Sequence, residues 1–239
     1  MIRTIIWVIY LALYLIYSLP TLWKMKRIDK SMHVEERDQL SGALPKRWSR
    51  SLVKLAGAKV NVEGLENVPK QGAVLFVSNH QGDFDIPILL GYIDKPKGFI
   101  SKEEVKKVPI VGQWMTVINC VFMQRKDRRQ SLQAIEEGAK MLQEGHSLVI
   151  FPEGTRSKGK EMGRFKAGSF RLALQSGVPI VPISINGSYQ LFEEKKLIRP
   201  GAVDLKIAAP IYAEQYKDMD VKEIANHIRG VIQEQQLNR

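Results

Sequence analysis

The sequence predicts an α/β fold, with a mixed, largely parallel central sheet flanked by helices and preceded by an N-terminal membrane-associated helical segment. Two observations carry this prediction. From about residue 57 onward, short apolar runs rich in β-branched residues alternate with segments of helical periodicity, as in strand–helix–strand units with parallel strands. Before that point, no charged residue occurs between Arg3 and Lys24, so the chain begins with a segment suited to lipid.

The N-terminal apolar segment, residues 4–23, has the ~20 residues that a membrane-spanning helix needs. A cleaved signal peptide is the alternative, but Arg3 is a weak charged head and the bulky residues 17–20 offer no small-residue cleavage site. Pro20 interrupts the helix shortly before a basic cluster. We therefore expect a membrane segment that either crosses the bilayer or lies in one leaflet. The basic cluster is Lys24, Lys26, Arg27 and Lys30.

The next segment, residues 31–60, reads as a polar connector followed by an amphipathic helix, in which Trp48 and Leu52 interleave with Lys46 and Arg50. Basic and apolar residues beside a hydrophobic helix suit anionic lipid, although a solvated face of a surface helix has the same pattern. We assign residues 1–56 to membrane-anchoring helices and residues 57–239 to the α/β domain. The basic flank places the protein at the cytoplasmic face of a membrane, such as a bacterial inner membrane.

Within the α/β domain, apolar runs predict strands and helical spacing predicts helices. The strands are expected at residues 60–62, 73–78, 117–123, 147–151, 181–185 and 203–207. The helices are expected at residues 129–144, 170–175 and 221–236. Because helices separate most of the strands, we expect the sheet to be largely parallel.

The net charge indicates the kind of partner, and the cysteine content excludes one kind of cross-link. Lys and Arg number 36 against 25 Asp and Glu, a net charge of +11, which favours an anionic partner such as phospholipid, nucleic acid or an acidic metabolite. The basic run 125–129 has no interleaved aromatics, so we expect no nucleic acid. Cys120 is the only cysteine, which excludes an intrachain disulfide, and we expect it to be a buried strand residue.

The first chemical motif follows the strand predicted at residues 73–78. His80 lies at the carboxyl edge of this strand, where α/β proteins place their sites. Asp85 with Pro87 predicts a helix start, with Asp85 as its cap. The turn between them can bring the carboxylate to Nδ1 of His80, which leaves Nε2 as a general base. For this segment alone, a capping Asp beside an incidental His is the competing interpretation.

The second motif follows the strand predicted at residues 147–151. Gly154 permits a close backbone approach, and the planar guanidinium of Arg156 suits phosphate. An exposed arginine on a surface turn is the alternative. If both loops lie at the same sheet edge, an acid–base pair and an anion clamp face one cleft.

Four blocks follow one another in order: His80-x-x-x-x-Asp85, residues 101–112 running on to Arg125, residues 151–156 (Phe-Pro-Glu-Gly-Thr-Arg) and residues 178–183. In order and spacing they resemble the motifs of the glycerolipid acyltransferases, most closely the 1-acylglycerol-3-phosphate O-acyltransferases (lysophosphatidate acyltransferases). The resemblance covers about residues 60–190. Val105 stands where the second block usually has leucine, a conservative departure.

The resemblance implies the reaction and the roles of the residues. A fatty acyl group would pass from acyl-CoA or acyl carrier protein to the sn-2 hydroxyl of 1-acyl-sn-glycerol 3-phosphate, giving phosphatidate. His80 would be the general base and Asp85 would orient it. Neither motif offers a Ser or Cys nucleophile beside the base, so we expect no acyl-enzyme. The residues implied to bind substrate are Lys102, Gly112, Arg125, Glu153, Gly154, Thr155 and Arg156.

The implied partners are lysophosphatidate, a phospholipid bilayer, and acyl-CoA or acyl carrier protein as co-substrate, with neither a cofactor nor a metal. Backbone N–H groups at the helix after Asp85 or around Gly112 are candidates for stabilising the oxyanion. The cations that follow Arg156 are candidates for the phosphates of coenzyme A or an acidic carrier protein. These cations are Lys158, Lys160, Arg164 and Lys166.

Three alternatives remain open at this point. In the first, the acyl acceptor is glycerol 3-phosphate or another lysophospholipid. In the second, a metal site for phosphoester hydrolysis is formed by His80, Asp83, Asp85 and Glu153. The third is a non-catalytic peripheral lipid-binding protein in which His80 is structural. His33, His146 and His227 have no carboxylate at a telling spacing, so we expect them at the surface or at helix ends.

Overall fold

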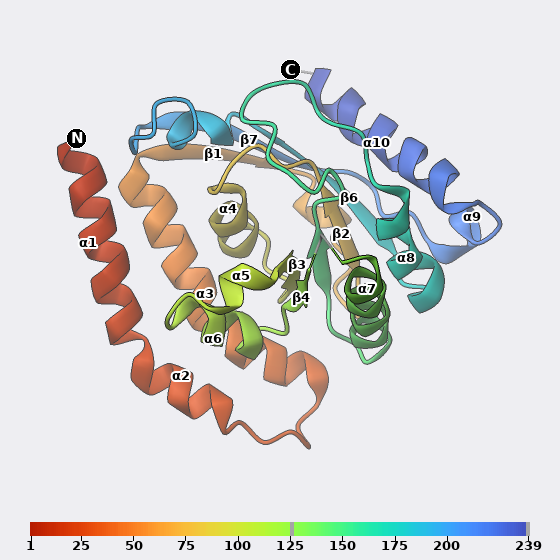
Figure 1. Ribbon diagram of the computed structural model, residues 1–239, viewed down its shortest axis with the longest axis horizontal. Helices are drawn as coiled ribbons and strands as arrows, with labels where there is room; N and C mark the ends of the chain where they lie inside the picture. The colour runs from red at the N-terminus through yellow and green to blue at the C-terminus, as the bar shows by residue number, and fades with distance from the viewer. Residues whose placement is uncertain (125–126, 238–239) are drawn as a thin grey trace.

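The computed structural model describes residues 1–124 and 127–237, and within them seven strands form one sheet in the order β1-β7-β6-β2-β5-β3-β4 (Figure 1). Neighbouring strands from β6 to β4 run parallel, as does β1 beside β7, whereas β6 and β7 are antiparallel. This arrangement confirms the predicted mixed, largely parallel sheet. The strands are β1 (Ala58–Glu63), β2 (Leu75–Ser78), β3 (Gly98–Lys102), β4 (Val121–Met123), β5 (Leu148–Ile150), β6 (Ile180–Asn186) and β7 (Gly201–Ile207).

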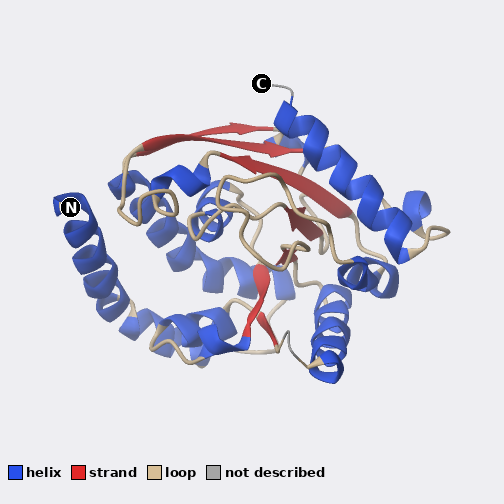
Figure 2. Ribbon diagram, turned by 45° about the horizontal axis from the view of Figure 1, so that its top comes forward, coloured by secondary structure: helices blue, strands red, loops and turns tan. Residues whose placement is uncertain are grey.

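Helices cover both faces of the sheet (Figure 2). Because side chains alternate along a strand, Leu75 and Val77 of β2 pack on one face with α7, α8 and α10, while Phe76 packs on the other with α3 and α4. The central strand therefore carries apolar side chains on both of its faces from Leu75 to Val77. The helices of the body are α3 (Val34–Ala56), α4 (Asp85–Tyr92), α5 (Glu103–Lys106), α6 (Val111–Val117), α7 (Arg128–Gln143), α8 (Arg171–Ser176), α9 (Ala213–Tyr216) and α10 (Val221–Leu237).

Two elements differ from the sequence prediction. The strand expected at residues 117–123 begins only at Val121, because α6 extends to Val117 and Asn119 turns the chain with a positive φ of 59°. The apolar residues before Val121, such as Ile118, pack in the core from a helix end rather than from a strand. Strand β3 was not predicted, because a run that begins with Gly98 and ends with Lys102 has little of the composition of a strand.

The N-terminal segment forms two helices, α1 (Ile2–Tyr17) and α2 (Leu19–Lys26). In the described part of the chain no single helix is long and apolar enough to cross a membrane, but α1 and α2 together reach that length and composition, with a bend of 44° between them. Pro20 lies in the first turn of α2, directly after the bend, as expected for a residue that cannot continue a helix.

One side of α1 is docked on the body. The indole nitrogen of Trp7 donates to the carbonyl oxygen of Leu52 at 2.9 Å, and its ring lies 5.6 Å from that of Phe84. The hydroxyl of Thr4 accepts from the backbone nitrogen of Ile198 at 2.9 Å. The remaining surface of α1 is apolar and exposed. Its large exposed residues are Ile2, Ile5, Ile6, Val8, Ile9, Leu13, Ile16 and Tyr17.

Candidate active site

The loops that follow β2 and β5 lie against each other at the carboxyl edge of the sheet. The two strands are parallel neighbours, with Val77 opposite Ile150. The backbone nitrogen of Ser157 donates to the carbonyl oxygen of His80 at 2.8 Å, and that of Lys158 donates to Gln81 at 3.1 Å. The two motif loops therefore share one edge of the sheet and are directly hydrogen-bonded.

His80 and Asp85 form a close pair in this edge. Nδ1 of His80 lies 2.7 Å from Oδ2 of Asp85, which is fully buried. The same oxygen accepts from the backbone nitrogens of Gln81 at 2.6 Å and Gly82 at 2.9 Å. An ionised carboxylate with these donors holds the proton of His80 on Nδ1, so Nε2 is the nitrogen that can accept a proton. The imidazole also stacks on Phe151, with ring centroids 4.1 Å apart.

The start of α4 differs from the prediction. Asp85 is the first residue of the helix rather than its cap, and Phe84 occupies the cap position without a side-chain hydrogen bond. The carboxylate turns back toward the preceding loop, because its acceptors are used by Gln81, Gly82 and His80. The helix start thus supplies the orienting group and the loop supplies the imidazole.

Glu153 supports the backbone of the histidine. Its Oε1 accepts from the backbone nitrogen of His80 at 2.7 Å, and its Oε2 accepts from that of Gly163 at 2.8 Å. Burial raises the pKa of Glu153, and these two hydrogen bonds oppose the shift. The structure therefore places Glu153 beneath the histidine loop, where it fixes His80.

Arg156 lies partly exposed beside the histidine loop. Its guanidinium is paired with Asp83, and NH1 also lies 3.3 Å from Oε1 of the buried Glu193. The neighbouring Gly154 has a φ of +71°, a backbone conformation that residues with a side chain rarely adopt. Thr155 is exposed. The arginine is thus held beside the histidine loop by two carboxylates, one of which, Asp83, is largely exposed and can release it.

The residues of the second block lie farther along the same edge or within the body. Lys102 is exposed at the carboxyl end of β3, which pairs with β5. Gly112 is buried in α6, where a side chain would collide with the carbonyl of Lys106, and its nitrogen donates to Val108 at 2.9 Å. The backbone N–H of Gly112 is therefore already hydrogen-bonded within the chain, so it is not placed to stabilise an oxyanion. Arg125 lies outside the described residues.

Comparison with known proteins gives the family. Residues 59–186 match the model of the family described as Acyltransferase, which is more than half of the chain. This chain belongs to the acyltransferase family.

Named relatives of this acyltransferase agree with one another. A "probable 1-acyl-sn-glycerol-3-phosphate acyltransferase" of Mycoplasma pneumoniae is 34% identical over 186 residues, covering 73% of this chain and 70% of the relative. The 1-acyl-sn-glycerol-3-phosphate acyltransferase of Escherichia coli is 27% identical, covering 77% and 75%. A chloroplastic one of Arabidopsis thaliana is 36% identical, but the chain spans only 45% of its length.

A solved structure extends the likeness to the whole fold. The 1-acyl-sn-glycerophosphate (LPA) acyltransferase PlsC from Thermotoga maritima superposes with a TM-score of 0.84 at 28% identity, covering 100% of this chain and 98% of that one. The acyltransferase thus shares with an enzyme of this class both the α/β body and the N-terminal helices.

Sequence reasoning missed several residues of the acyltransferase site. The hydroxyl of Ser188, fully buried after β6, donates to Oδ1 of Asp85. Glu193 is buried too, and its Oε1 accepts from the backbone nitrogen of Asp83 at 2.6 Å. The nearest signal was the turn Gly187-Ser188 at the end of a predicted strand, but the sequence does not show that this strand lies beside the one ending at Ser78.

The structure also tests the predictions made for His146 and Cys120, which lie outside the site. His146 lies just after the end of α7, as expected, where its backbone nitrogen donates to Met141, but it is buried rather than at the surface, and its Nδ1 lies 2.6 Å from Oδ2 of Asp38 on α3. Cys120 is buried as expected, but it directly precedes β4 rather than lying in a strand, and burial raises the pKa of its thiol to about 12. Among the described residues, no group of three or more His, Cys, Asp or Glu is arranged to hold a metal ion.

Replacing Ser188 with alanine is expected to lower kcat about tenfold without changing either KM, because a hydrogen bond to a charged group is lost. Ser184→Ala, at another buried serine of the β6 region, is the control and should leave kcat unchanged. An equal fall in kcat for both variants would make Ser188 a packing residue only.

Proposed function

We propose that this acyltransferase transfers a fatty acyl group from acyl-CoA or acyl carrier protein to the sn-2 hydroxyl of 1-acyl-sn-glycerol 3-phosphate, giving phosphatidate. The observation that carries the proposal is the His80–Asp85 pair at the same sheet edge as Arg156. The printed names of the relatives and of the solved neighbour support the acceptor.

The proposed chemistry is a direct transfer. Nε2 of His80 takes the proton of the acceptor hydroxyl while its oxygen attacks the thioester carbonyl. When the C–S bond breaks, the imidazolium returns that proton to the leaving thiolate. Asp85 holds the tautomer and stabilises the imidazolium. Cys120 is buried and Ser188 is bonded to Asp85, so neither is placed as a nucleophile beside His80, and acyl-CoA or the carrier is the only co-substrate that we propose.

The acceptor phosphate is assigned to Arg156 and Lys102. The guanidinium of Arg156 can exchange its contact with the exposed Asp83 for one with a phosphate, while Glu193 keeps the guanidinium in place. Two parallel N–H bonds of a guanidinium fit a phosphate well. Arg156→Lys is therefore expected to raise the KM for lysophosphatidate by about tenfold or more, because one ammonium cannot reproduce both bonds. Steady-state kinetics with each substrate varied will test this. An equal rise in the KM for acyl-CoA would mean that Arg156 holds the loop instead.

The acyl donor is assigned to the exposed basic segment that follows Arg156. Its side chains reach solvent beside the cleft loop and suit the phosphates of coenzyme A or an acidic carrier protein. These side chains are Lys158, Lys160, Arg164 and Lys166.

The membrane contact is assigned to residues 1–56, and catalysis to residues 57–239. The exposed apolar face of α1 continues into the exposed Trp23 and the basic cluster at and just after the end of α2, an arrangement that suits an anionic leaflet. Helix α3 packs against α4 and thereby joins the two parts. A lipid-bound α1 would keep the cleft at the headgroup plane, where the acceptor hydroxyl of lysophosphatidate lies.

The triple change Ile6→Ser, Ile9→Ser and Leu13→Ser removes exposed apolar area but keeps the docked side of α1. Each lost side chain is worth about 1.5–3 kcal/mol on burial in lipid, so less protein should pellet with anionic vesicles. Activity on vesicle-borne lysophosphatidate should fall more than activity on a short-chain soluble acceptor. Leu174→Ser, at an exposed leucine of α8, is the matched control. Unchanged pelleting of the triple variant would remove α1 as the anchor.

One assay tests the function as a whole. Purified protein is incubated with oleoyl-CoA and, separately, lysophosphatidate, glycerol 3-phosphate or lysophosphatidylcholine. Preferred acylation of lysophosphatidate is the expected result. Preference for another acceptor would change the substrate and keep the chemistry, whereas lipid binding without any acylation would leave a non-catalytic lipid-binding protein.

A further inference from the structure

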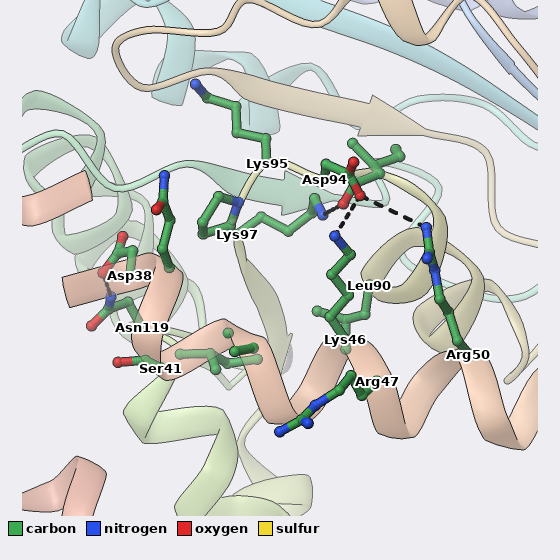
Figure 3. A pocket seen from close by; sticks show the side chains of 16 residues that line it. Asp38, Ser41, Lys46, Arg47, Arg50, Leu90, Asp94, Lys95, Lys97 and Asn119 are labelled. Carbon is green, nitrogen blue, oxygen red and sulfur yellow. Dashed lines mark hydrogen bonds and ion pairs between the residues drawn. The ribbon is translucent and has the colours of Figure 1, made fainter. Parts of the chain in front are cut away.

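A polar cavity lies away from His80 in the fold. It has a volume of about 580 Å³ and opens between α3 and the segment that joins α4 to β3 (Figure 3). Because Lys97 and Asn119 in its wall precede β3 and β4, the cavity lies at the amino ends of these parallel strands, whereas His80 follows the carboxyl end of β2. A ligand in this cavity would not touch the reacting groups.

Three cationic side chains converge on one carboxylate in the cavity wall. Nζ of Lys46 lies 2.5 Å and NH2 of Arg50 3.8 Å from Oδ1 of Asp94, and Figure 3 shows the end of Lys97 directed to the same place. Lys46 and Arg50 are one helical turn apart on α3, so they face the same side. The hydrogen bond from Lys46 and the charges of all three cations hold the pKa of Asp94 below its usual value.

Lys97 makes the charge balance of this cluster unusual. It is buried, and its ammonium donates to the carbonyl oxygens of Ile93 at 2.9 Å and Leu89 at 3.1 Å at the end of α4. Burial, followed by the charge of Lys46, lowers the pKa of Lys97 to about 7; Asp94 opposes this shift and Lys95 adds to it. The cluster of Lys46, Arg50 and Lys97 therefore carries more positive charge than one carboxylate balances.

The carboxylate at the centre of the cluster is replaceable. The side chain of Asp94 is 78% exposed, so it can turn to water at little cost. Three cations facing a single carboxylate match a dianion better than a monoanion, and a phosphomonoester carries about −1.5 to −2 at pH 7. We propose that this cavity binds a phosphomonoester group, which displaces Asp94 and is held by Lys46, Arg50 and Lys97.

The proposed site is joined to the catalytic pair by one short helix. α4 begins at Asp85 and ends at Tyr92, two residues before Asp94. Eight residues of α-helix are about 12 Å long, so the two phosphate sites are separate and can be measured apart. A mutation that removes one phosphate site leaves the residues of the other phosphate site in place.

Binding of inorganic phosphate to the Arg156→Ala protein, measured by calorimetry, tests the site without the contribution of the catalytic cleft. Adding Asp94→Asn should tighten binding about tenfold, because the internal competitor loses its charge. Adding Lys46→Ala or Arg50→Ala should weaken it about tenfold. Lys54→Ala, at an exposed lysine of the same helix that does not line the cavity, is the control and should change nothing.

The expected gain in the Asp94→Asn variant is decisive, because misfolding cannot produce it. Bound dianion also favours charged Lys97, so sulfate binding near pH 7.5, which we choose close to the pKa of Lys97, should take up protons, as measured in buffers of different ionisation enthalpy. If Asp94→Asn binds phosphate no more tightly than its parent, the cluster is an internal ion pair between α3 and the α4–β3 segment, and the proposal is overturned.

The source of the phosphate is separated by a second set of measurements. The same variants are tested against vesicles that contain phosphatidate and against vesicles that contain phosphatidylglycerol. A response to Asp94→Asn in free phosphate alone identifies a soluble phosphomonoester, and a response with phosphatidate vesicles identifies a lipid headgroup. An equal response with phosphatidylglycerol would contradict selectivity for a phosphomonoester and overturn the assignment of the ligand.

Discussion

Replacing His80 with alanine is expected to reduce acyl transfer by about 10²–10⁴-fold, the usual contribution of a general base. The acceptor hydroxyl has a pKa far above 7, and the imidazole is the group that Asp85 holds ready to take its proton. The loss should appear in kcat and kcat/KM alike, since proton transfer belongs to the reacting state.

The control for this change is His227→Ala, at an exposed histidine of α10. Thermal unfolding of both variants should be recorded, because the His80 ring also packs on Phe151. A His80→Ala protein that keeps a tenth of the wild-type rate would rule out the general-base role.

Asp85→Asn is expected to lower kcat by a factor that approaches about 10⁴, with little change in the KM for lysophosphatidate. An amide cannot hold the Nδ1 proton of His80 as a carboxylate does, and in a His–Asp arrangement of this kind the wrong tautomer causes losses of that size. The amide also faces Gln81, Gly82 and Ser188, all of which donate to the carboxylate in the native protein.

Kinetics at saturating acyl-CoA, together with a thermal melt, separate these effects. Asp83→Asn is the matched comparison, because Asp83 contacts Arg156 rather than His80. It should alter the KM for the acceptor and leave kcat nearly intact. An effect of Asp85→Asn on KM alone would reduce Asp85 to a structural role in the loop.

The fold was predictable where a run of apolar residues coincides with a strand. β2 and β5 are buried on both faces, so their sequences are apolar apart from Ser78 at the end of β2, and their positions were predicted within two residues. β3 was not predicted, because only its middle residues are strongly apolar. The apolar run at 117–123 was wrongly predicted to be a single strand, because a helix end, a turn at Asn119 and a strand all pack apolar side chains in the same core.

The candidate site was predictable where its partners are close in sequence. His80 and Asp85 are five residues apart, and one turn brings them together. Ser188 lies 103 residues from Asp85, and Glu193 lies 110 from Asp83, so only the placement of β6 beside β2 reveals them. The same holds for His146 and Asp38, which are 108 residues apart.

The contact between Trp7 and Phe84 makes one side chain an optical probe of two regions. Phe84 directly precedes Asp85, while Trp7 belongs to the helix whose other side is exposed and apolar. The chain has four tryptophans, so replacing Trp23, Trp48 and Trp114 with phenylalanine leaves a single emitter at this junction. Its fluorescence then reports, in one signal, when lipid reaches α1 and when an acceptor binds beside the loop before α4.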